Sequence, residues 1–392
     1  MKIHQTILIL LTIVALIGST SCRKQLTTTA PPPNTNSNSA VAPEESGGGE
    51  ASVGEKFLFR GTIAAGSNNL RIEMNLVRDG EVTGTYFYPK VGKNIALNGS
   101  IDKDGTLELR EKDDSGKETG VFKGKWKAAV EPFELGMANI AGKWSRPDGT
   151  KETTFELTQQ PIEFRTAGAH FAPKVLKETN KQSRYRFEVV YPQIDGDARF
   201  DKFNKEVRAM VNKNVAAFKT SETAGAADTS SDLPAETQNS TLDSDYEIRL
   251  ATDDLISIEF SESAYERGAA HPNNYSTVLN YDVRNGKKLA LADLFNPKAN
   301  YLKAISDYCL KDLKQQQKKD KDSMLSDDMI QSGVAPRADN FNAWTITTHG
   351  LWITFDPYQV APYAAGPQRV LIPYSALKDL IKRDGPVAVF AE

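Results

Sequence analysis

Between residues 55 and 160 the chain alternates short apolar or β-branched segments with turns that contain glycine. Asp-Gly pairs stand at positions 79–80, 104–105 and 148–149. The neighbouring segments alternate apolar and polar residues, as Ile72, Met74 and Leu76 show. An Asp-Gly pair between two such segments is the local signature of an antiparallel hairpin. The sequence therefore predicts a small all-β domain over residues 55–160, a meander that can curl into a barrel.

The remainder, residues 161–392, mixes strand and helix patterns. The segment RYRFEVVYP alternates as a strand, and the segment after it places Phe203, Val207 and Val211 on one helical stripe. A polar stretch at about 220–242 predicts a flexible loop. The expected fold class is therefore α+β, with a mixed domain of antiparallel sheet and packed helices following the β domain.

Later segments refine this expectation for the mixed domain. Asn285-Gly286 is a strong signal for a two-residue hairpin turn. A long helix is expected over residues 297–319, and a second helix in SALKDLIKR should close the chain. Trp344 and Trp352 lie on neighbouring predicted strands, and we assign both to the core rather than to a sugar-binding surface.

The N-terminus has the features of an export signal. Lys2 precedes an apolar run of about twelve residues, which ends in small residues before Cys22. The run is shorter than the ~20 residues of a membrane span. Cys22 resembles the acylated cysteine of a bacterial lipobox, although Ser19 replaces the usual leucine. We predict a lipoprotein signal peptide over 1–21 and acyl chains such as palmitate on Cys22; the alternative is an ordinary secretory signal with an incidental cysteine.

Residues 22–54 are rich in Thr, Pro, Asn, Ser and Gly and contain almost nothing to bury. Such a segment cannot offset its ordering entropy, so we expect a disordered tether. The expected location is the cell envelope, lipid-anchored to a membrane and extracytoplasmic. The residue after the cysteine is Arg23 rather than aspartate, which resembles outer-membrane sorting in a cell with two membranes.

Charge and cysteine content narrow the function classes. Removal of residues 1–21 takes away one lysine and no acid, which leaves 47 basic and 51 acidic residues, a net charge of about −4. This balance argues against nucleic-acid binding. Cys22 and Cys309 are the only cysteines, so an acylated Cys22 leaves no intramolecular disulfide. Leu302, Ile305, Cys309 and Leu313 recur at helical spacing, which favours a buried structural thiol over a reactive one.

The segment GAAHPNNYSTV begins at Gly268 and contains His271. Gly268 permits an unusual backbone angle, Pro272 directs His271 away from helix, and Asn273 and Asn274 can cap a turn through their side chains. We interpret His271 as part of a turn, with contact to a ligand as the main alternative.

Catalysis is the weakest interpretation of His271. Apart from the signal segment, the histidines are His170, His271 and His349, and no pair stands at helical ligand spacing. Ser276 lies near His271, but nothing in the sequence orients them as a nucleophile and base. We therefore expect no catalytic residue, no metal and no cofactor.

The second candidate segment is PYQVAPYAAGP, in which Tyr358 and Tyr363 precede Gly366. Tyrosine rings bury large area at low entropic cost, so the pair can anchor a binding surface. The alternative is that both rings cover the end of a sheet.

Two stretches carry a resemblance to known families. GAAHPNNYSTVLNYDVRNGKKLALADLF and LWITFDPYQVAPYAAGPQRVLIPYSAL resemble the C-terminal extracytoplasmic domain of the anti-sigma factor RsiV. RYRFEVVYPQIDGDARFDKFNKEV is similar to the domain that accompanies it, which also precedes the catalytic domain of the peptidoglycan deacetylase PdaC. The resemblance covers about residues 180–385.

This resemblance implies a shared sensor or binding part. An RsiV-type factor needs a transmembrane helix and a cytoplasmic segment, and a PdaC-type enzyme needs a metal-binding catalytic domain, so we expect neither activity here. In RsiV the shared part recognises lysozyme. The implied partner is a wall-active protein such as lysozyme, or a peptidoglycan fragment, bound by Tyr358 and Tyr363 with His271, Asn273 and Asn274. The alternative is an enzyme or enzyme accessory protein acting on cell-wall glycan.

Overall fold

The computed structural model describes residues 55–391, apart from 66–67, 80, 89–92, 128–137, 167 and 225–236. The predicted signal peptide, Cys22 and the tether up to residue 54 therefore lie outside the described residues, as do positions 225–236 of the predicted loop. The described residues all belong to one compact unit of the chain, Ser52–Glu392. Within this part of the chain, no helix has the length and apolar character needed to span a membrane.

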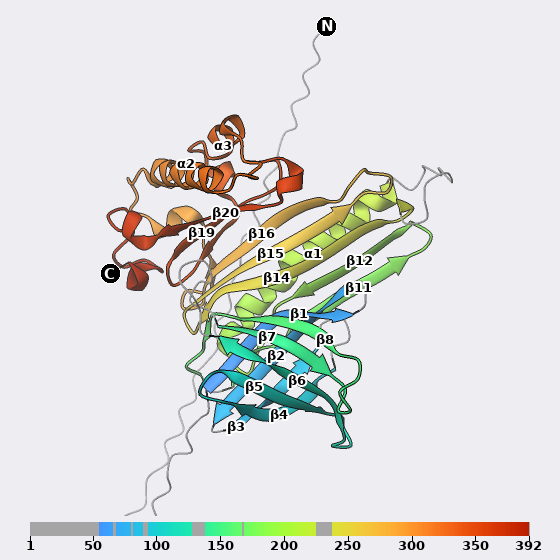
Figure 1. Ribbon diagram of the computed structural model, residues 1–392. Helices are drawn as coiled ribbons and strands as arrows, with labels where there is room; N and C mark the ends of the chain where they lie inside the picture. Colours follow the sequence, from blue (N-terminus) through green and yellow to red (C-terminus); the bar gives the residue numbers. More distant parts are fainter. Residues whose placement is uncertain are drawn as a thin grey trace, which may run out of the picture. The chain divides into compact units, whose positions relative to one another are not determined.

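Eight strands of the described chain form a closed antiparallel barrel (Figure 1). They are β1 (Glu55–Ala65), β2 (Asn68–Asp79), β3 (Glu81–Phe87), β4 (Ile95–Ile101), β5 (Thr106–Lys112), β6 (Glu118–Lys127), β7 (Asn139–Ser145) and β8 (Thr153–Gln159). Each strand pairs with the next, and β8 pairs back onto β1. The predicted Asp-Gly hairpins join β2 to β3, β4 to β5 and β7 to β8. The predicted meander thus closes on itself.

Alternate residues of the barrel strands fill its interior. Met74 and Phe122 are completely buried there, as expected because an eight-stranded barrel is just wide enough for side chains to fill. One buried carboxylate interrupts this apolar core: Glu111 accepts hydrogen bonds from the Tyr86 hydroxyl (2.5 Å) and from Trp144 Nε1 (3.0 Å). Both donors lie inside the same barrel, so Glu111 is a satisfied structural group.

A second, larger sheet follows the barrel in sequence. Its main strands are β11 (Lys174–Asn180), β12 (Tyr185–Tyr191), β14 (Ser240–Thr252), β15 (Leu255–Tyr265), β16 (Asn273–Asp282) and β17 (Lys287–Lys288), paired in that order. The predicted antiparallel sheet is confirmed only in part, because most neighbouring strands pair antiparallel but β12 and β14 run parallel. The helix α1 (Asp201–Ala224) connects these two strands, and parallel neighbours need such a crossover. The fold is α+β with a mixed sheet.

The helix α1 covers one face of this sheet (Figure 1). Its predicted apolar stripe is confirmed: Phe203, Val207 and Val211 are buried against strand residues such as Ile258 and Leu279. The helix leaves the opposite face of the sheet open to other elements, and the candidate site lies on that face.

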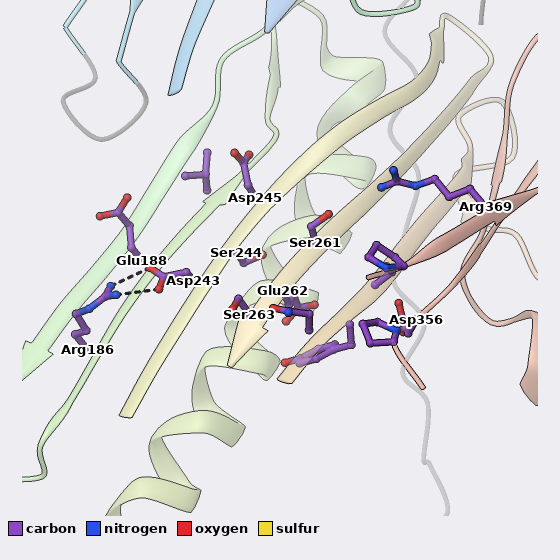
Figure 2. A pocket seen from close by; sticks show the side chains of 16 residues that line it. Arg186, Glu188, Asp243, Ser244, Asp245, Ser261, Glu262, Ser263, Asp356 and Arg369 are labelled. Atoms are coloured by element: carbon purple, nitrogen blue, oxygen red, sulfur yellow. Dashed lines mark hydrogen bonds and ion pairs between the residues drawn. The ribbon is translucent and has the colours of Figure 1, made fainter. Parts of the chain in front are cut away.

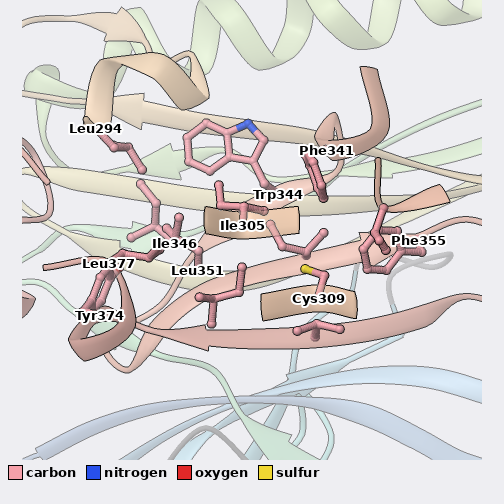
Figure 3. Packing of buried hydrophobic residues seen from close by; sticks show 14 of the residues in the cluster. Leu294, Ile305, Cys309, Phe341, Trp344, Ile346, Leu351, Phe355, Tyr374 and Leu377 are labelled. Atoms are coloured by element: carbon pink, nitrogen blue, oxygen red, sulfur yellow. The ribbon is translucent and has the colours of Figure 1, made fainter. Parts of the chain in front are cut away.

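The C-terminal part consists of a three-stranded sheet and two helices. These are α2 (Tyr301–Lys319), α3 (Asp327–Gly333), β18 (Trp344–Ile346), β19 (Gly350–Phe355) and β20 (Gln368–Pro373). Trp344 and Trp352 lie on paired strands and are buried, as predicted. Cys309 of α2 is completely buried among Ile305, Phe341 and other core residues (Figure 3), which confirms its assignment as a buried thiol.

Short elements complete the described chain. They are β9 (Ile162–Glu163), β10 (His170–Phe171), β13 (Ile194–Asp195) and the 3-10 helices η1 (Ala198–Phe200), η3 (Leu291–Leu294), η4 (Ala338–Phe341), η5 (Tyr363–Ala365), η6 (Tyr374–Ala376) and η7 (Ala388–Phe390). The hairpin predicted at Asn285-Gly286 exists, but its strands end at Asp282 and resume at Lys287, so the connection is four residues long rather than two.

The prediction of a closing helix in SALKDLIKR was wrong. The segment begins within the 3-10 turn η6 and then pairs with an earlier part of the chain. The backbone NH of Asn296 donates to the carbonyl of Leu380, and the NH of Lys382 donates to the carbonyl of Leu294. These long-range bonds replace helical ones, and Ile381 is buried beside Phe295. Tertiary pairing therefore overrides a local pattern that would suit a helix.

Candidate ligand-binding site

The C-terminal sheet is fixed to part of the open face of the large sheet by buried polar contacts. The backbone NH of Ile346 donates to the Ser257 hydroxyl (2.8 Å), and Asn280 Nδ2 donates to the carbonyl of Trp344 (2.8 Å). The Thr354 hydroxyl donates to Glu259 Oε1 (2.7 Å). Ser257 and Glu259 lie on β15, two residues apart, so they point to the same face of the sheet. These contacts position β18 and β19 over one half of that face.

The other half of the face forms an open groove of about 640 Å³ (Figure 2). Its lining includes Arg186, Glu188, Asp243, Asp245, Ser261, Ser263, Asn274, Ser276, Asp356 and Arg369. Strands β12, β14, β15 and β16 supply the floor through alternate residues, because side chains two positions apart share a face. Asp356, which directly follows β19, and Arg369 of β20 form a wall. We call this cavity the groove.

The groove is rich in hydrogen-bonding groups of both charges. Arg186 and Asp243 form a two-point ion pair across β12 and β14, with N–O distances of 2.9 and 3.0 Å. Burial raises the pKa of the Asp356 carboxyl above its ordinary value, and hydrogen bonds with Ser276 oppose the rise. Ser261 lies exposed in the groove. Such a lining suits a ligand with several hydroxyl or amide groups.

Beside the groove lies an aromatic cluster, formed by His271, Tyr358 and Tyr363. The His271 ring stacks on Tyr363 with centroids 4.0 Å apart and an interplanar angle of 24°. His271 Nε2 lies 3.3 Å from the Tyr358 hydroxyl, and the two tyrosine rings are 5.7 Å apart. Asn274 joins the cluster to the groove, because it lines the groove and donates from Nδ2 to the Tyr363 hydroxyl (2.9 Å).

Tyr358 has an unusual backbone conformation for a bulky residue. Its φ is 71°, in the left-handed region that glycine normally occupies, and 56% of its surface is exposed. Its backbone NH donates to the carbonyl of Ala361 (3.0 Å), which holds this conformation in a tight loop. Left-handed backbone costs of order 1–3 kcal/mol for such a residue, and outliers of this kind concentrate at functional sites. The conformation presents the ring to solvent.

The structure brings together most of the residues selected from the sequence. His271, Asn274, Tyr358 and Tyr363 are in direct contact, although two segments far apart in sequence supply them. The interpretation of both rings as a cover for the sheet end does not describe Tyr358, which is largely exposed. Asn273 lies exposed at the start of β16, next to the cluster in sequence.

The predicted turn has a different construction. Gly268 has φ 82°, as expected, but the reversal is closed by the backbone NH of Ala269 bonding to Glu266, before His271. The predicted capping role of the asparagines is therefore wrong for Asn274, whose amide reaches across to Tyr363. His271 Nδ1 instead lies 2.9 Å from the carbonyl of Pro272.

Sequence reasoning missed the groove. Its signal was present as polar residues two apart on β14 and β15, such as Asp243 with Asp245 and Ser261 with Ser263. Such alternation is also typical of the solvent side of any half-buried strand, so it does not identify a groove by itself. The wall with Asp356 and Arg369 comes from a distant segment.

The remaining histidines lie elsewhere and contact their own surroundings. His170 is in β10, with Nδ1 2.7 Å from the carbonyl of Gly168. His349 lies in the hairpin between β18 and β19, 3.0 Å from the Thr348 hydroxyl. Among the described residues, no three His, Cys, Asp or Glu side chains are grouped so that they could hold a metal ion.

Two known families match the region that contains the groove and the cluster. The family described as "Deacetylase PdaC" matches residues 178–274, and the one described as "Protein of unknown function (DUF3298)" matches residues 292–375. The C-terminal region resembles both of these domains. The first match contains most of the groove floor, and the second contains Asp356, Tyr358 and Tyr363. The candidate site therefore lies where the two matched segments meet.

Individual relatives agree with this resemblance. The chain is 28% identical over 218 residues to the peptidoglycan-N-acetylmuramic acid deacetylase PdaC of Bacillus subtilis, covering 56% of this chain and 44% of the deacetylase. It is 30% identical over 140 residues to the anti-sigma-V factor RsiV of the same bacterium, covering 35% of this chain and 47% of RsiV. The chain thus spans about half the length of these two curated relatives.

Solved structures of the DUF3298 family also align with the chain. A member from Bacteroides fragilis gives a TM-score of 0.44 at 17% identity, covering 58% of this chain and 98% of that one. A member from Pseudomonas aeruginosa gives a TM-score of 0.37 at 19% identity, covering 55% of this chain and 96% of that one.

Proposed function

We propose that this chain is a non-catalytic binding or sensing module of the cell envelope, anchored through an acylated Cys22. The observation that carries the proposal is the meeting of two distant segments at the aromatic cluster, where His271 stacks on Tyr363 and Tyr358 projects into solvent. The resemblance to an envelope deacetylase and to an anti-sigma factor supports a role at the cell surface.

The proposed partner of the aromatic cluster is a wall-active protein such as lysozyme. A tyrosine that projects from a rigid loop can insert into a cleft of a partner protein, and such aromatic anchors dominate interface energies. Asn274 holds Tyr363, and Tyr363 in turn supports His271, so the cluster is organised before binding. An organised surface loses less entropy when a complex forms. Asn273 and Asn274 would form the polar rim.

A second candidate ligand is a peptidoglycan fragment, and the groove favours it. Serine, asparagine, carboxylate and guanidinium groups line the groove together, and Tyr363 lies next to it through Asn274. A glycan offers hydroxyl and amide groups that match such a lining. This ligand would depend on Asp243 and Ser263 in the groove, whereas a protein partner would depend most on Tyr358.

Isothermal titration calorimetry with lysozyme and with muropeptides tests both candidates. The protein is the full chain with Cys22→Ser, which removes the acylation site. Tyr358→Ala should weaken lysozyme binding by about 2 kcal/mol or more, roughly a 30-fold rise in Kd. Asn273→Ala should cost much less because rim groups contribute little. The matched control is Met324→Ala, a second exposed apolar residue away from the cluster, which should bind like the parent protein.

The variants also separate the two ligands. Asp243→Asn should weaken muropeptide binding and leave lysozyme binding unchanged, while Tyr358→Ala should have the larger effect on lysozyme. Circular dichroism confirms folding of each variant first. Equal affinities for parent, Tyr358→Ala and Asp243→Asn would remove the assignment of both surfaces. Absence of binding to either ligand class would contradict the proposed partners.

Anchoring at Cys22 is tested separately by mass spectrometry of the protein from its own host. Acylation should add the mass of several fatty acyl chains at Cys22, and Cys22→Ser should release the protein from membrane fractions. More than one acyl chain is needed for stable attachment. An unmodified Cys22 would contradict the anchoring part and leave the binding surfaces unaffected.

A further inference from the structure

One of the contacts between the barrel and the large sheet is a buried arginine, Arg60 of β1. Its Nη2 donates to Asp245 Oδ1 on β14 (2.8 Å), and its Nη1 donates to the backbone carbonyl of Tyr246. Its guanidinium carbon lies 3.9 Å from the centre of the Tyr246 ring. Its Nε lies 3.2 Å from Oε2 of Glu73, a β2 residue of the same barrel. Arg60 therefore faces two carboxylates from two different sheets.

These charged groups are almost completely removed from water. The side chain of Arg60 is 11% exposed, that of Asp245 is 8% exposed and that of Glu73 is fully buried. Burial of a charge is costly unless the group is both paired and hydrogen-bonded. The stability of the junction between the barrel and the large sheet therefore depends on which hydrogen-bond donors and ion-pair partners each carboxylate has.

The two carboxylates are satisfied very differently. Asp245 Oδ1 accepts from Arg60 and also from the backbone NH of Tyr246 (2.7 Å). Neither oxygen of Glu73 has an aligned hydrogen-bond donor, and its one ion-pair contact is to an arginine that already serves Asp245. When a buried site holds more negative charge than its donors can satisfy, the less satisfied carboxyl takes up a proton. That group is Glu73.

The groups that face Glu73 support this assignment. Arg60 approaches from β1, and Asp245 and Tyr246 approach from β14, while its cross-strand neighbour on β3 is the uncharged Phe87. Burial raises the pKa of Glu73 to about 7; Arg60 opposes the rise and Asp245 adds to it. The group therefore titrates near neutral pH.

We propose that Glu73 and Arg60 form a proton-linked clasp between the barrel and the large sheet. With Glu73 protonated, Arg60 is satisfied by Asp245, by the Tyr246 carbonyl and by the Tyr246 ring. With Glu73 ionised, a fully buried carboxylate whose one ion-pair partner is the Arg60 guanidinium shared with Asp245 destabilises the closed junction. Water can reach that carboxylate when β1 and β2 separate from β14, so loss of the proton favours opening.

The clasp also reaches the groove, because Asp245 is both a clasp residue and part of the groove lining. Opening would move the guanidinium of Arg60 away from this carboxylate and change the charge at that end of the groove. Two events that share one residue are thermodynamically linked, and the link works in both directions. This consequence rests on the proposed role of the groove, whereas the clasp itself does not.

Hydrogen exchange followed by mass spectrometry tests the clasp. The full chain with Cys22→Ser is compared from pH 5.5 to 8.5, with rates corrected for intrinsic exchange at each pH. Peptides from β1, β2 and β14 report opening of the junction. From pH 5.5 up to about 7, the opening constant should rise by up to roughly tenfold for each pH unit, because opening is linked to the loss of one proton, and it should level off at higher pH, where Glu73 is ionised in both states. Peptides from α2 serve as an internal reference.

Three variants test whether Glu73 is the group that links opening to pH. Glu73→Gln keeps the shape without the charge, so its opening constant should not depend on pH in this range. Asp245→Asn removes the carboxylate that repels an ionised Glu73, so the pH midpoint should fall. The matched control is Glu111→Gln, a second buried carboxyl of the barrel that makes no contact with Arg60, and it should keep the parent pH profile. The same pH profile in Glu73→Gln as in the parent, or a flat profile in the parent, would overturn the clasp.

Discussion

Asn274 donates a hydrogen bond from Nδ2 to the Tyr363 hydroxyl over 2.9 Å, and the two residues are 89 positions apart in the chain. This bond connects β16 with the loop that follows β19, and it lies between the groove and the aromatic cluster. It also explains how a loop with an exposed tyrosine keeps one arrangement, because Tyr363 is held from one side by Asn274 and covered on its ring by His271.

Tyr363→Phe should remove this bond and leave the ring stacking intact. One hydrogen bond contributes about 0.5–1.5 kcal/mol, so we expect the free energy of unfolding to fall by about 1 kcal/mol. Tyr358→Phe is the matched control, because its hydroxyl contacts only the exposed His271 among the described residues and should change stability less. Urea denaturation with an unchanged m-value measures both. Equal midpoints for the two variants would contradict the structural role of the Asn274 bond.

Local signals in the sequence were sufficient for much of the fold. Asp-Gly pairs with alternating neighbours fixed the barrel hairpins, and the stripe of Phe203, Val207 and Val211 identified α1. The parallel pairing of β12 and β14 was missed, although a strand, a helix and a strand in succession favour it. The closing helix was missed for another reason: its backbone pairs with Leu294 and Asn296, which no local pattern reveals.

In the candidate site, too, local sequence signals identified some residues, whereas long-range contacts determined the rest. Glycine, proline, asparagine and tyrosine singled out both loops of the aromatic cluster, but their contact depends on the C-terminal sheet lying on β15 and β16. Glu73 was not identified at all, because a glutamate between Ile72 and Met74 has the pattern of a solvent-facing position on a barrel strand. It is buried because β14, far away in sequence, lies against that side of the barrel.

Glu259 is expected to be among the most sensitive positions of the large sheet. It accepts from Arg249 Nη2 (2.6 Å) and from the Thr354 hydroxyl (2.7 Å), and it is buried. Glu259→Ala removes the buried carboxylate that pairs with the largely buried Arg249 guanidinium, and the loss of one member of such a buried pair typically costs about 3–5 kcal/mol. The same arginine also pairs with Glu247, which is half exposed, so Glu247→Ala should cost less than about 1 kcal/mol. Chemical denaturation compares the two, and similar losses would contradict the buried-pair account.

Cys309 should be chemically inert in the folded protein. Burial raises the pKa of its thiol well above the ordinary range, and a thiol reacts mainly as the thiolate. In the full chain with Cys22→Ser, the only remaining cysteine is Cys309. Ellman's reagent should react very slowly with the native protein and with one thiol per chain in urea. Fast reaction of the native protein would show that α2 opens readily or that the thiol is accessible.

The stability of the protein should fall as the pH rises through neutrality, and Glu73 determines the direction. Its pKa is raised by burial from 4.5 in the unfolded chain to about 7 in the folded protein, so between these values the folded state holds a proton that the unfolded state has lost. The stabilising contribution is therefore complete below pH 4.5 and is lost as the pH rises to about 7, in contrast to a carboxylate with a lowered pKa. The shift corresponds to about 3 kcal/mol in the free energy of unfolding.

Glu73→Gln should remove this dependence. The free energy of unfolding of the variant minus that of the parent protein should therefore be larger at pH 8 than at pH 4.5. Urea denaturation at both pH values measures the effect, and an equal pH dependence in the two proteins would contradict the assignment of the buried proton to Glu73.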